Sequence, residues 1–288
     1  MEKPVTKLIA LVDGSIYSQS VCDHAAWIAQ RTGASVELLH VLGRREAASA
    51  PSNLSGNITL GARSVLLEEL TALDEQWAKL GQKRGRAILD DAKASIEAAG
   101  VRPVVTKLRI GDIVETVAEF EADAGMVVIG KRGEAADFAK LHLGSNLERI
   151  VRSSAKPVFV SSRTFKPIER FLIAYDGGAS SKKAVDCVAS GKLFAGLQCR
   201  LLTVGADTPE TRKRLEEARA QLEAAGLAVD ASIVQGQPEA AISHAVESGA
   251  IDLLVMGAYG HSRVRSLIIG STTTDMVRLC KIPIALFR

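Results

Sequence analysis

The chain has few aromatic residues and no marked excess of either charge. Aromatic residues make up 4% of its 288 residues, and 36 Lys and Arg stand against 33 Asp and Glu, for a formal net charge of +3. A nucleic-acid-binding surface needs a basic cluster, and a site for single strands also needs aromatic rings on which bases stack. The sequence has neither feature, so we predict no nucleic-acid partner.

Long apolar runs and metal-ligand spacings are also missing. The first apolar run ends at Asp13 and is too short for a signal-peptide core or for a membrane span of ~20 residues. The four cysteines form no CxxC pair, and the five histidines form no HExxH pattern. We therefore expect a cytoplasmic protein with reduced thiols, without a membrane partner and without a metal site.

The second half of the chain repeats the first. The segment LIALVDGS at 8–15 recurs as FLIAYDGG at 171–178, which places Asp13 opposite Asp176. Further along, IEAAGV recurs as LEAAGL at a smaller offset. The shorter offset means that the first half carries an insertion, which we place at about residues 44–80.

The length of the chain fits two domains, since a domain usually takes ~100 to 200 residues. The polar segment Ser161–Arg170, which contains a proline, separates one apolar run from the next and marks the boundary. We predict two homologous domains, residues 1–163 and 164–288.

Within each half, short apolar runs alternate with stretches of helical periodicity. The runs are rich in β-branched residues and nearly continuous, as buried parallel strands are. Helices are expected between them, the first with Ser18 as its N-cap. This alternation predicts an α/β fold of two tandem, doubly wound, Rossmann-like domains, each with a five-stranded parallel sheet. The first-half strands are predicted at 7–12, 36–41, 104–108, 126–129 and 158–160, and the further helices at 112–121 and 146–153.

A glycine-rich loop follows one apolar run in each half. In the second half, Gly257, Gly260 and Gly270 precede hydroxyl residues and a predicted helix. Backbone N–H groups at a helix start favour an anion such as phosphate, and glycine lets the backbone approach it closely. The same residues also suit a plain turn with a hydroxyl N-cap, so the loop alone leaves both interpretations open. Neither a P-loop nor a dinucleotide-binding GxGxxG fingerprint occurs.

The spacing G-x2-G-x9-G-[ST], in a domain whose first strand ends in Asp, resembles the nucleotide-binding signature of the universal stress protein family. The segment 252–287 is similar to the last third of that family, and the resemblance extends to both halves. The chain thus resembles a tandem universal stress protein, with the adenine nucleotide alpha hydrolase-like fold that this implies. In ATP-binding members, the Asp at the end of the first strand and a Val at the end of the second contact adenosine, while the glycines and the following Ser or Thr hold the phosphates.

The resemblance implies one nucleotide site in each half. The first-half loop has one more residue between its second and third glycines and carries Glu134 and Asp137, although Lys131 and Arg132 add positive charge. We therefore expect the second half to be the better ATP site, where Arg263 would add a charge-assisted contact. The second-half set is Asp176, Val204, Met256, Gly257, Gly260, Arg263, Gly270, Ser271 and Thr272, and the first-half set is Asp13, Val41, Ile129, Gly130, Gly133, Gly144, Ser145 and Asn146.

No residue set resembles a catalytic machinery. Hydrolysis of ATP would need a base that positions water, and no residue is identifiable as one. We expect a stress-response protein that binds ATP, alone or with Mg²⁺, and regulates rather than catalyses. Two alternatives stay open, namely a nucleotide-independent interaction or scaffold protein and a slow ATP hydrolase. The halves are expected to pair face to face as an intramolecular pseudo-dimer, and a homodimer is a further option.

The insertion carries a narrow apolar stripe. Its members alternate spacings of four and three residues, which is typical of one helix face. Our first expectation is that this stripe packs against the protein's own body, and the alternative is a dimer contact or a lid over the first-half pocket. The stripe consists of Leu66, Leu70, Leu73, Trp77 and Leu80.

Overall fold

The computed structural model describes residues 6–43, 60–133, 145–258 and 270–288, without the side chains of 60–66 and 145. The first half comprises β1 (Lys7–Leu11), α1 (Ser18–Thr32), β2 (Ser35–Leu42), α2 (Leu60–Ala98), β3 (Val104–Ile110), α3 (Ile113–Phe120), the short 3-10 helix η1 (Glu121–Asp123), β4 (Met126–Gly130), α4 (Ser145–Ser153) and β5 (Val158–Ser161). The second half comprises β6 (Arg170–Ala174), α5 (Ala179–Ser190), β7 (Gln198–Val204), α6 (Pro209–Ala224), β8 (Ala228–Val234), α7 (Pro238–Ser248), β9 (Leu253–Gly257), α8 (Ser271–Leu279) and β10 (Ile284–Phe287). The predicted α/β alternation is confirmed.

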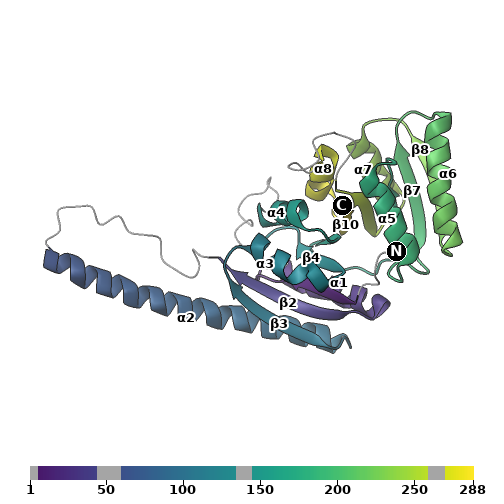
Figure 1. Cartoon of the computed structure of the whole chain (residues 1–288). Coiled ribbons are helices and arrows are strands. Elements are labelled where there is room, and N and C mark those ends of the chain that lie inside the picture. The colour runs from purple at the N-terminus through teal and green to yellow at the C-terminus, as the bar shows by residue number, and fades with distance from the viewer. Residues whose placement is uncertain (1–5, 44–59, 134–144, 259–269) are drawn as a thin grey trace.

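The ten described strands form one sheet, in the order β3-β2-β1-β4-β5-β10-β9-β6-β7-β8 (Figure 1). Five parallel strands come from each half, and β5 pairs with β10 in antiparallel orientation. The expectation that the halves pair face to face is wrong, because their sheets meet edge to edge. An edge strand exposes unpaired N–H and C=O groups, and the two edge strands satisfy each other's groups here.

The β5–β10 pairing is locally symmetric. Phe159 lies opposite Ala285, and Val160 lies opposite Ile284. Phe159 and Ala285 also occupy equivalent positions in the repeat, two residues after Pro157 and Pro283. A local two-fold axis therefore passes between them, as in an isologous interface.

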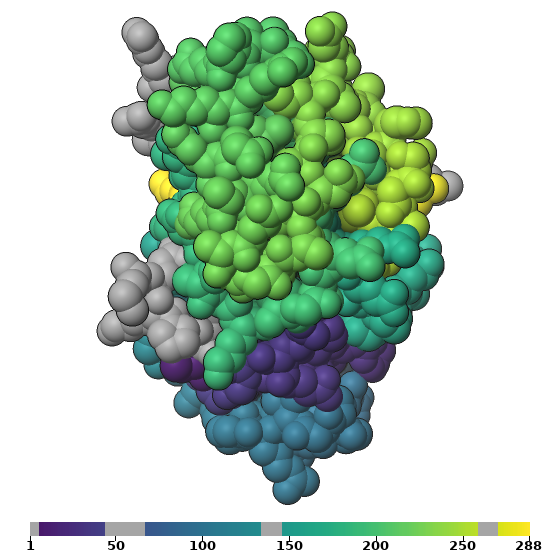
Figure 2. All heavy atoms as spheres, turned by 90° about the vertical axis from the view of Figure 1, so that its right-hand side faces the viewer, coloured from purple at the N-terminus to yellow at the C-terminus, as the bar shows by residue number. Residues whose placement is uncertain are grey.

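Helices cover both faces of the sheet, as in a doubly wound fold. Helices α1, α2, α5 and α6 contribute to one hydrophobic core, and α3, α4, α7 and α8 contribute to the other. Each core contains residues of both halves. The corresponding helices α2 and α6 lie at opposite ends of the molecule, with α2 in blue and α6 in green in the space-filling view (Figure 2).

Polar contacts also join the halves. The Arg31 guanidinium, at the end of α1, donates to the carbonyls of Leu193 and Ala195. The Arg288 Nη1 atom lies 2.8 Å from the carbonyl of Arg152, at the end of α4. A cation near the end of a helix is stabilised by the partial negative charge of its last carbonyls.

The apolar stripe of the insertion lies on α2, a helix of 39 residues whose first part extends past the rest of the molecule (Figure 1). Leu73, Trp77 and Leu80 are 49%, 60% and 57% exposed. The expectation that this stripe packs against the protein's own body is therefore wrong for these three residues. The side chain of Leu66 lies outside the described part of the chain.

The later part of α2 packs closely on the sheet. A Cβ atom at Gly85 would lie 2.7 Å from Leu108 Cδ1 and 2.9 Å from His40 Cδ2, so only a glycine fits there without a shift of its neighbours. Leu89 and Ile96, further along the same face, are buried. Gly85 thus marks the point at which α2 meets the body.

No helix within the described ranges is long and apolar enough to cross a membrane.

His24 is a fully buried polar residue of α1. Its Nδ1 atom lies 2.6 Å from the Ser20 carbonyl, and its ring packs against Phe159 and Phe165. Its Nε2 atom has no hydrogen-bond partner in the described part of the chain. Burial lowers the pKa of His24, so the imidazole is held neutral in the folded protein.

We predict that His24 makes the protein less stable in acid. Because the pKa of His24 is lowered on folding, the unfolded chain takes up a proton near pH 6.5 while the folded chain does not. The free energy of unfolding should thus fall as the pH drops below 6.5, by up to about 1.4 kcal/mol per pH unit from this group. Urea unfolding of His24→Phe should show a shallower acid dependence than the wild type. His244→Phe, at an exposed position on α7, is the matched control. Parallel pH profiles for His24→Phe and the wild type would contradict the prediction.

Candidate functional site

The candidate sites lie at the carboxyl ends of β1 and β4 in the first half and of β6 and β9 in the second. In the first half the chain runs from β1 to β2 and β3 on one side, and returns to β4 and β5 on the other. The helices after β1 and β4 cover opposite faces of the sheet. Such a switch point is where doubly wound sheets bind ligands. Because β5 and β10 are antiparallel, the two sites open at opposite ends of the strands.

An aspartate follows the first strand of each half and is held in the same way. Asp13 Oδ1 accepts hydrogen bonds from Ser15 N at 3.0 Å and from Ser18 Oγ at 3.3 Å. Asp176 Oδ1 accepts them from Gly178 N at 2.8 Å and from Ser181 Oγ at 2.6 Å. These bonds fix the orientation of both carboxylates.

The expectation that Ser18 caps α1 is wrong. The N-cap is Tyr17, which makes no side-chain cap bond. The Ser18 hydroxyl instead reaches back to the turn after β1, where it accepts a hydrogen bond from Gly14 N at 2.9 Å. The serine therefore ties the start of the helix to Asp13 and its turn.

The end of the second strand is tied to the end of the first strand in both halves. His40 Nδ1 donates to the Val12 carbonyl at 2.6 Å. Its counterpart Thr203 donates through Oγ1 to the Tyr175 carbonyl at 2.9 Å. Different side chains thus make the same connection.

Four apolar residues of the predicted sites, two in each half, are buried or partly buried. They lie at the ends of the second and fourth strands of their half and pack into the core under α3, α4, α7 and α8. The four residues are Val41 and Ile129 in the first half, and Val204 and Met256 in the second.

The glycine that ends each fourth strand is required by packing. A Cβ atom at Gly130 would lie 2.7 Å from Tyr17 Cβ. A Cβ atom at Gly257 would lie 2.9 Å from Ser180 Cβ and 3.1 Å from Ser181 N. These glycines let the strand end approach the start of α1 or α5, whether or not a ligand is bound.

The next glycine also meets the site in the first half. A Cβ atom at Gly133 would lie 2.9 Å from Asp13 Oδ2. The loop after β4 therefore passes directly beside this carboxylate. Its counterpart Gly260, together with Arg263 and Gly144, lies outside the described residues, as does the side chain of Ser145.

Helix α8 begins differently from our expectation of a hydroxyl N-cap. Gly270 is the N-cap and offers no side-chain bond. Ser271 is exposed, and Thr272 Oγ1 donates to Glu239 Oε1 at 2.7 Å. This hydrogen bond lowers the pKa of Glu239. A carboxylate of α7 thus lies beside the start of α8. This contact is not evident from the sequence, because only the packing of α7 on α8 brings the two residues together.

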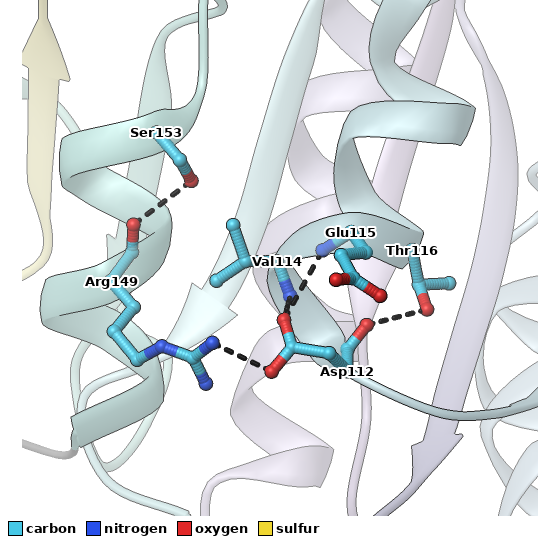
Figure 3. Close-up of polar contacts among 6 residues, drawn as sticks. All are labelled: Asp112, Val114, Glu115, Thr116, Arg149 and Ser153. Atoms are coloured by element: carbon cyan, nitrogen blue, oxygen red, sulfur yellow. Dashed lines mark hydrogen bonds and ion pairs between the residues drawn. The ribbon is translucent and has the colours of Figure 1, made fainter.

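In the first half, an ion pair joins α4 to the start of α3. Asp112 caps α3 by accepting from Val114 N at 2.9 Å and Glu115 N at 3.3 Å, and its Oδ2 atom lies 2.6 Å from Arg149 Nη2 of α4 (Figure 3). The hydrogen bond from Arg149 lowers the pKa of Asp112. Asn146, predicted here as a ligand residue, is exposed at the start of α4.

Lys131, which was expected to add positive charge to the first-half site, contacts the other half of the molecule. Its ammonium donates to the Cys280 carbonyl at the end of α8, in the other half of the molecule. Burial lowers the pKa of Lys131 to about 8. The positive charge of Lys131 therefore stabilises a helix end of the second half.

An arginine lies beside the turn after the first strand in each half. A Cβ atom at Gly14 would lie 3.9 Å from Arg84 Nη2, and one at Gly177 would lie 3.7 Å from Arg214 Nη1. Both glycines have a positive φ, of 77° and 73°, which favours glycine at these turns. The position of these arginines beside the turns is not evident from the sequence, because the two residues do not occupy matching positions in the repeat.

Comparisons with known proteins identify the family of this chain. The profile of the Universal stress protein family matches residues 4–162 and 200–288. The universal stress protein Slr1230 of Synechocystis sp. is 38% identical over 284 residues, which cover 98% of this chain and 99% of that protein. This chain belongs to the universal stress protein family.

Two other universal stress proteins are similar to this chain over different extents. A universal stress protein of Thermus aquaticus, 32% identical over 134 residues, matches 96% of its own length to 41% of this chain. A solved universal stress protein from Archaeoglobus fulgidus has a TM-score of 0.73 and 21% identity, with 98% of this chain and 96% of that chain covered. The similarity to the Archaeoglobus fulgidus structure shows that the present chain has the same fold as that protein over nearly its whole length.

We predict that Gly257→Ala destabilises the protein by about 1 to 3 kcal/mol even in the absence of any ligand, because the new methyl group overpacks the start of α5. Urea unfolding measures this loss. In Ser180→Gly/Gly257→Ala, part of the loss should be recovered, because the nearest obstructing atom is the Cβ of Ser180. Additive effects of the two substitutions would contradict the packing explanation.

Proposed function

We propose that this protein binds ATP with Mg²⁺ in its second half and acts in the cytoplasm as a nucleotide-responsive regulator of a stress response, without dedicated catalysis. We also propose that residues 1–163 and 164–288 are duplicated domains joined as an intramolecular pseudo-dimer. The observation that carries the binding proposal is the fixed Asp176 carboxylate at the switch point of a doubly wound sheet.

The adenosine side of the proposed site combines one polar group with an apolar wall. The hydrogen bonds from Gly178 and Ser181 engage Asp176 Oδ1 and set the direction of the carboxylate before any ligand binds. A carboxylate in this position suits a ribose hydroxyl or the adenine amino group, both of which donate hydrogen bonds. Val204 and Met256 supply apolar surface for the base.

The phosphate side is supported by the start of α8 and by Arg214. The first N–H groups of an α-helix have no partner within the helix, and the helix dipole favours an anion there. Gly270, as N-cap, places no side chain over these groups. The guanidinium of Arg214, beside the Gly177 turn, adds positive charge.

Glu239 is the reason to include Mg²⁺. Its carboxylate shares the start of α8 with the proposed phosphates, and two anions there would repel each other. Mg²⁺ is commonly bound by one or two carboxylates together with substrate phosphates. Glu239, with the Thr272 hydroxyl beside it, supplies oxygen ligands of this kind, so ATP should bind better with Mg²⁺ than without it.

The first half is the weaker candidate. Lys131, its nearby cation, is directed to the Cys280 carbonyl of the other half. Arg149 of α4 is paired with Asp112, the N-cap of α3. Two positive charges that phosphates could use are therefore engaged in structural contacts.

A nucleotide-independent interaction protein is the second candidate function. The observation that favours it is the exposed apolar stripe on α2, which has no counterpart on α6. A chain that presents such a surface is suited to bind another protein.

We predict that Asp176→Asn weakens the affinity for ATP and Mg²⁺ at least about tenfold, which corresponds to ~1.4 kcal/mol. The amide oxygen of asparagine can still accept from Gly178 and Ser181, so the fold should be retained. Asp13→Asn is the matched control in the first half and should change the affinity much less. Isothermal titration calorimetry measures both effects, and mass spectrometry of ligand released from purified protein checks for bound nucleotide.

Three other outcomes of these experiments would change the assignment of the site or of the function. A loss of affinity in Asp13→Asn with none in Asp176→Asn would place the site in the first half. An absence of both bound nucleotide and titratable ATP would favour the interaction protein. Release of ADP at a rate abolished by Asp176→Asn would support the slow hydrolase.

A further inference from the structure

Helix α2 carries two separate apolar stripes. We call residues 85–98 the docking segment, because its stripe is buried against the sheet and α1. We call residues 67–84 the projecting segment, because this part of α2 extends beyond the body (Figure 1). The docking stripe is Gly85, Leu89, Ala92 and Ile96, all buried, and the projecting stripe is Leu70, Leu73, Trp77 and Leu80, of which the last three are exposed.

The two stripes point in different directions. Each stripe alternates spacings of three and four residues, but Leu80 and Gly85 are five residues apart. At 3.6 residues per turn, the mean direction of the projecting stripe therefore differs from that of the docking stripe by about 110° around the helix axis. The projecting stripe is therefore no continuation of the contact with the body, and it needs a partner of its own to be buried.

We propose that this partner is the same segment of a second copy of the chain, packed antiparallel to the first. The stripe has the spacing three, four, three, which reads the same in both directions. A two-fold axis at Glu75 places Leu70 opposite Leu80 of the second copy, and Leu73 opposite Trp77 of the second copy. Every member of the stripe thus meets an apolar residue, as in the core layers of an antiparallel coiled coil.

The charges of the projecting segment agree with this arrangement. Its first part is acidic, and its last part, together with Arg86 two residues beyond it, is basic. Antiparallel pairing brings the acidic part of one copy beside the basic part of the other, whereas parallel pairing would oppose like charges. In this register Glu69, beside the stripe, faces Lys83 of the second copy. The acidic residues are Glu68, Glu69, Asp74 and Glu75, and the basic residues are Lys79, Lys83, Arg84 and Arg86.

The position of α2 also permits such a pair. The body is attached to the C-terminal part of α2, so an antiparallel pair places the two bodies at opposite ends of the paired helices. The projecting segment is about 27 Å long at 1.5 Å per residue. An interface of this length lies at the small end of specific contacts, so the dimer should form reversibly.

Analytical ultracentrifugation of the full chain over a wide concentration range tests the proposal. The wild type should show a reversible monomer–dimer equilibrium, and Leu73→Glu should raise its dissociation constant at least tenfold. Thr71→Glu, which adds the same charge at an exposed position away from the stripe, is the matched control and should leave the constant within about twofold. Thermal unfolding verifies that Leu73→Glu folds, which is expected because Leu73 is exposed.

Charge reversal tests the antiparallel register. Glu69→Lys and Lys83→Glu should each weaken the dimer, because each creates a like-charge pair across the interface. The double variant should restore the wild-type constant, because it exchanges the two charges. Trp77 gives an independent readout in a Trp27→Phe background, in which its fluorescence should shift to shorter wavelength as the dimer forms.

Three results would overturn the proposal. One is a wild type that stays monomeric at every concentration, and another is a dimer that Leu73→Glu leaves unchanged. The third is a double charge reversal no better than the single ones, which would rule out this register. If Leu73→Glu altered ATP affinity and left the mass unchanged, the stripe would act as a lid over a site of its own chain.

Discussion

The antiparallel pairing of β5 with β10 is the contact on which the rest of the architecture depends. It turns two five-stranded sheets into one sheet, so that each hydrophobic core extends through both halves. It also reverses the direction of the second set of strands. As a result, the carboxyl ends of one half lie beside the helix ends of the other, and Lys131 reaches Cys280 while Arg288 reaches Arg152. A cation of each half thus stabilises a helix end of the other half.

The two halves keep the same framework while their side chains have diverged. The connection made by His40 in the first half is made by Thr203 in the second. The last helix of each half contacts an acidic residue at the start of the helix before it, but the first half uses an ion pair and the second a threonine hydroxyl. Divergence of this kind preserves the fold and gives the two sites different charges, which is the physical basis for expecting different affinities.

The strands and the turns that carry Asp13 and Asp176 could be predicted from the sequence, because apolar runs and Asp-Gly turns are local patterns. The contact of Thr272 with Glu239 could not, since it depends on how α7 and α8 pack. The edge-to-edge joining was missed for a similar reason, because a sequence does not show which strand edge stays open. The stripe that includes Trp77 was recognised as helical, but its exposure follows from the rotation between two parts of one helix.

The continuity of α2 has a mechanical consequence. A single helix contains both the exposed Trp77 and Ile88. Ile88 lies beside the Gly14 turn, because a Cβ atom at Gly14 would lie 2.7 Å from Ile88 Cδ1. Closely packed interiors transmit strain, so a tilt of the outer end would press Ile88 against the turn that follows Asp13. Linkage then requires reciprocity, and a ligand that displaced this turn would also move the outer end of the helix.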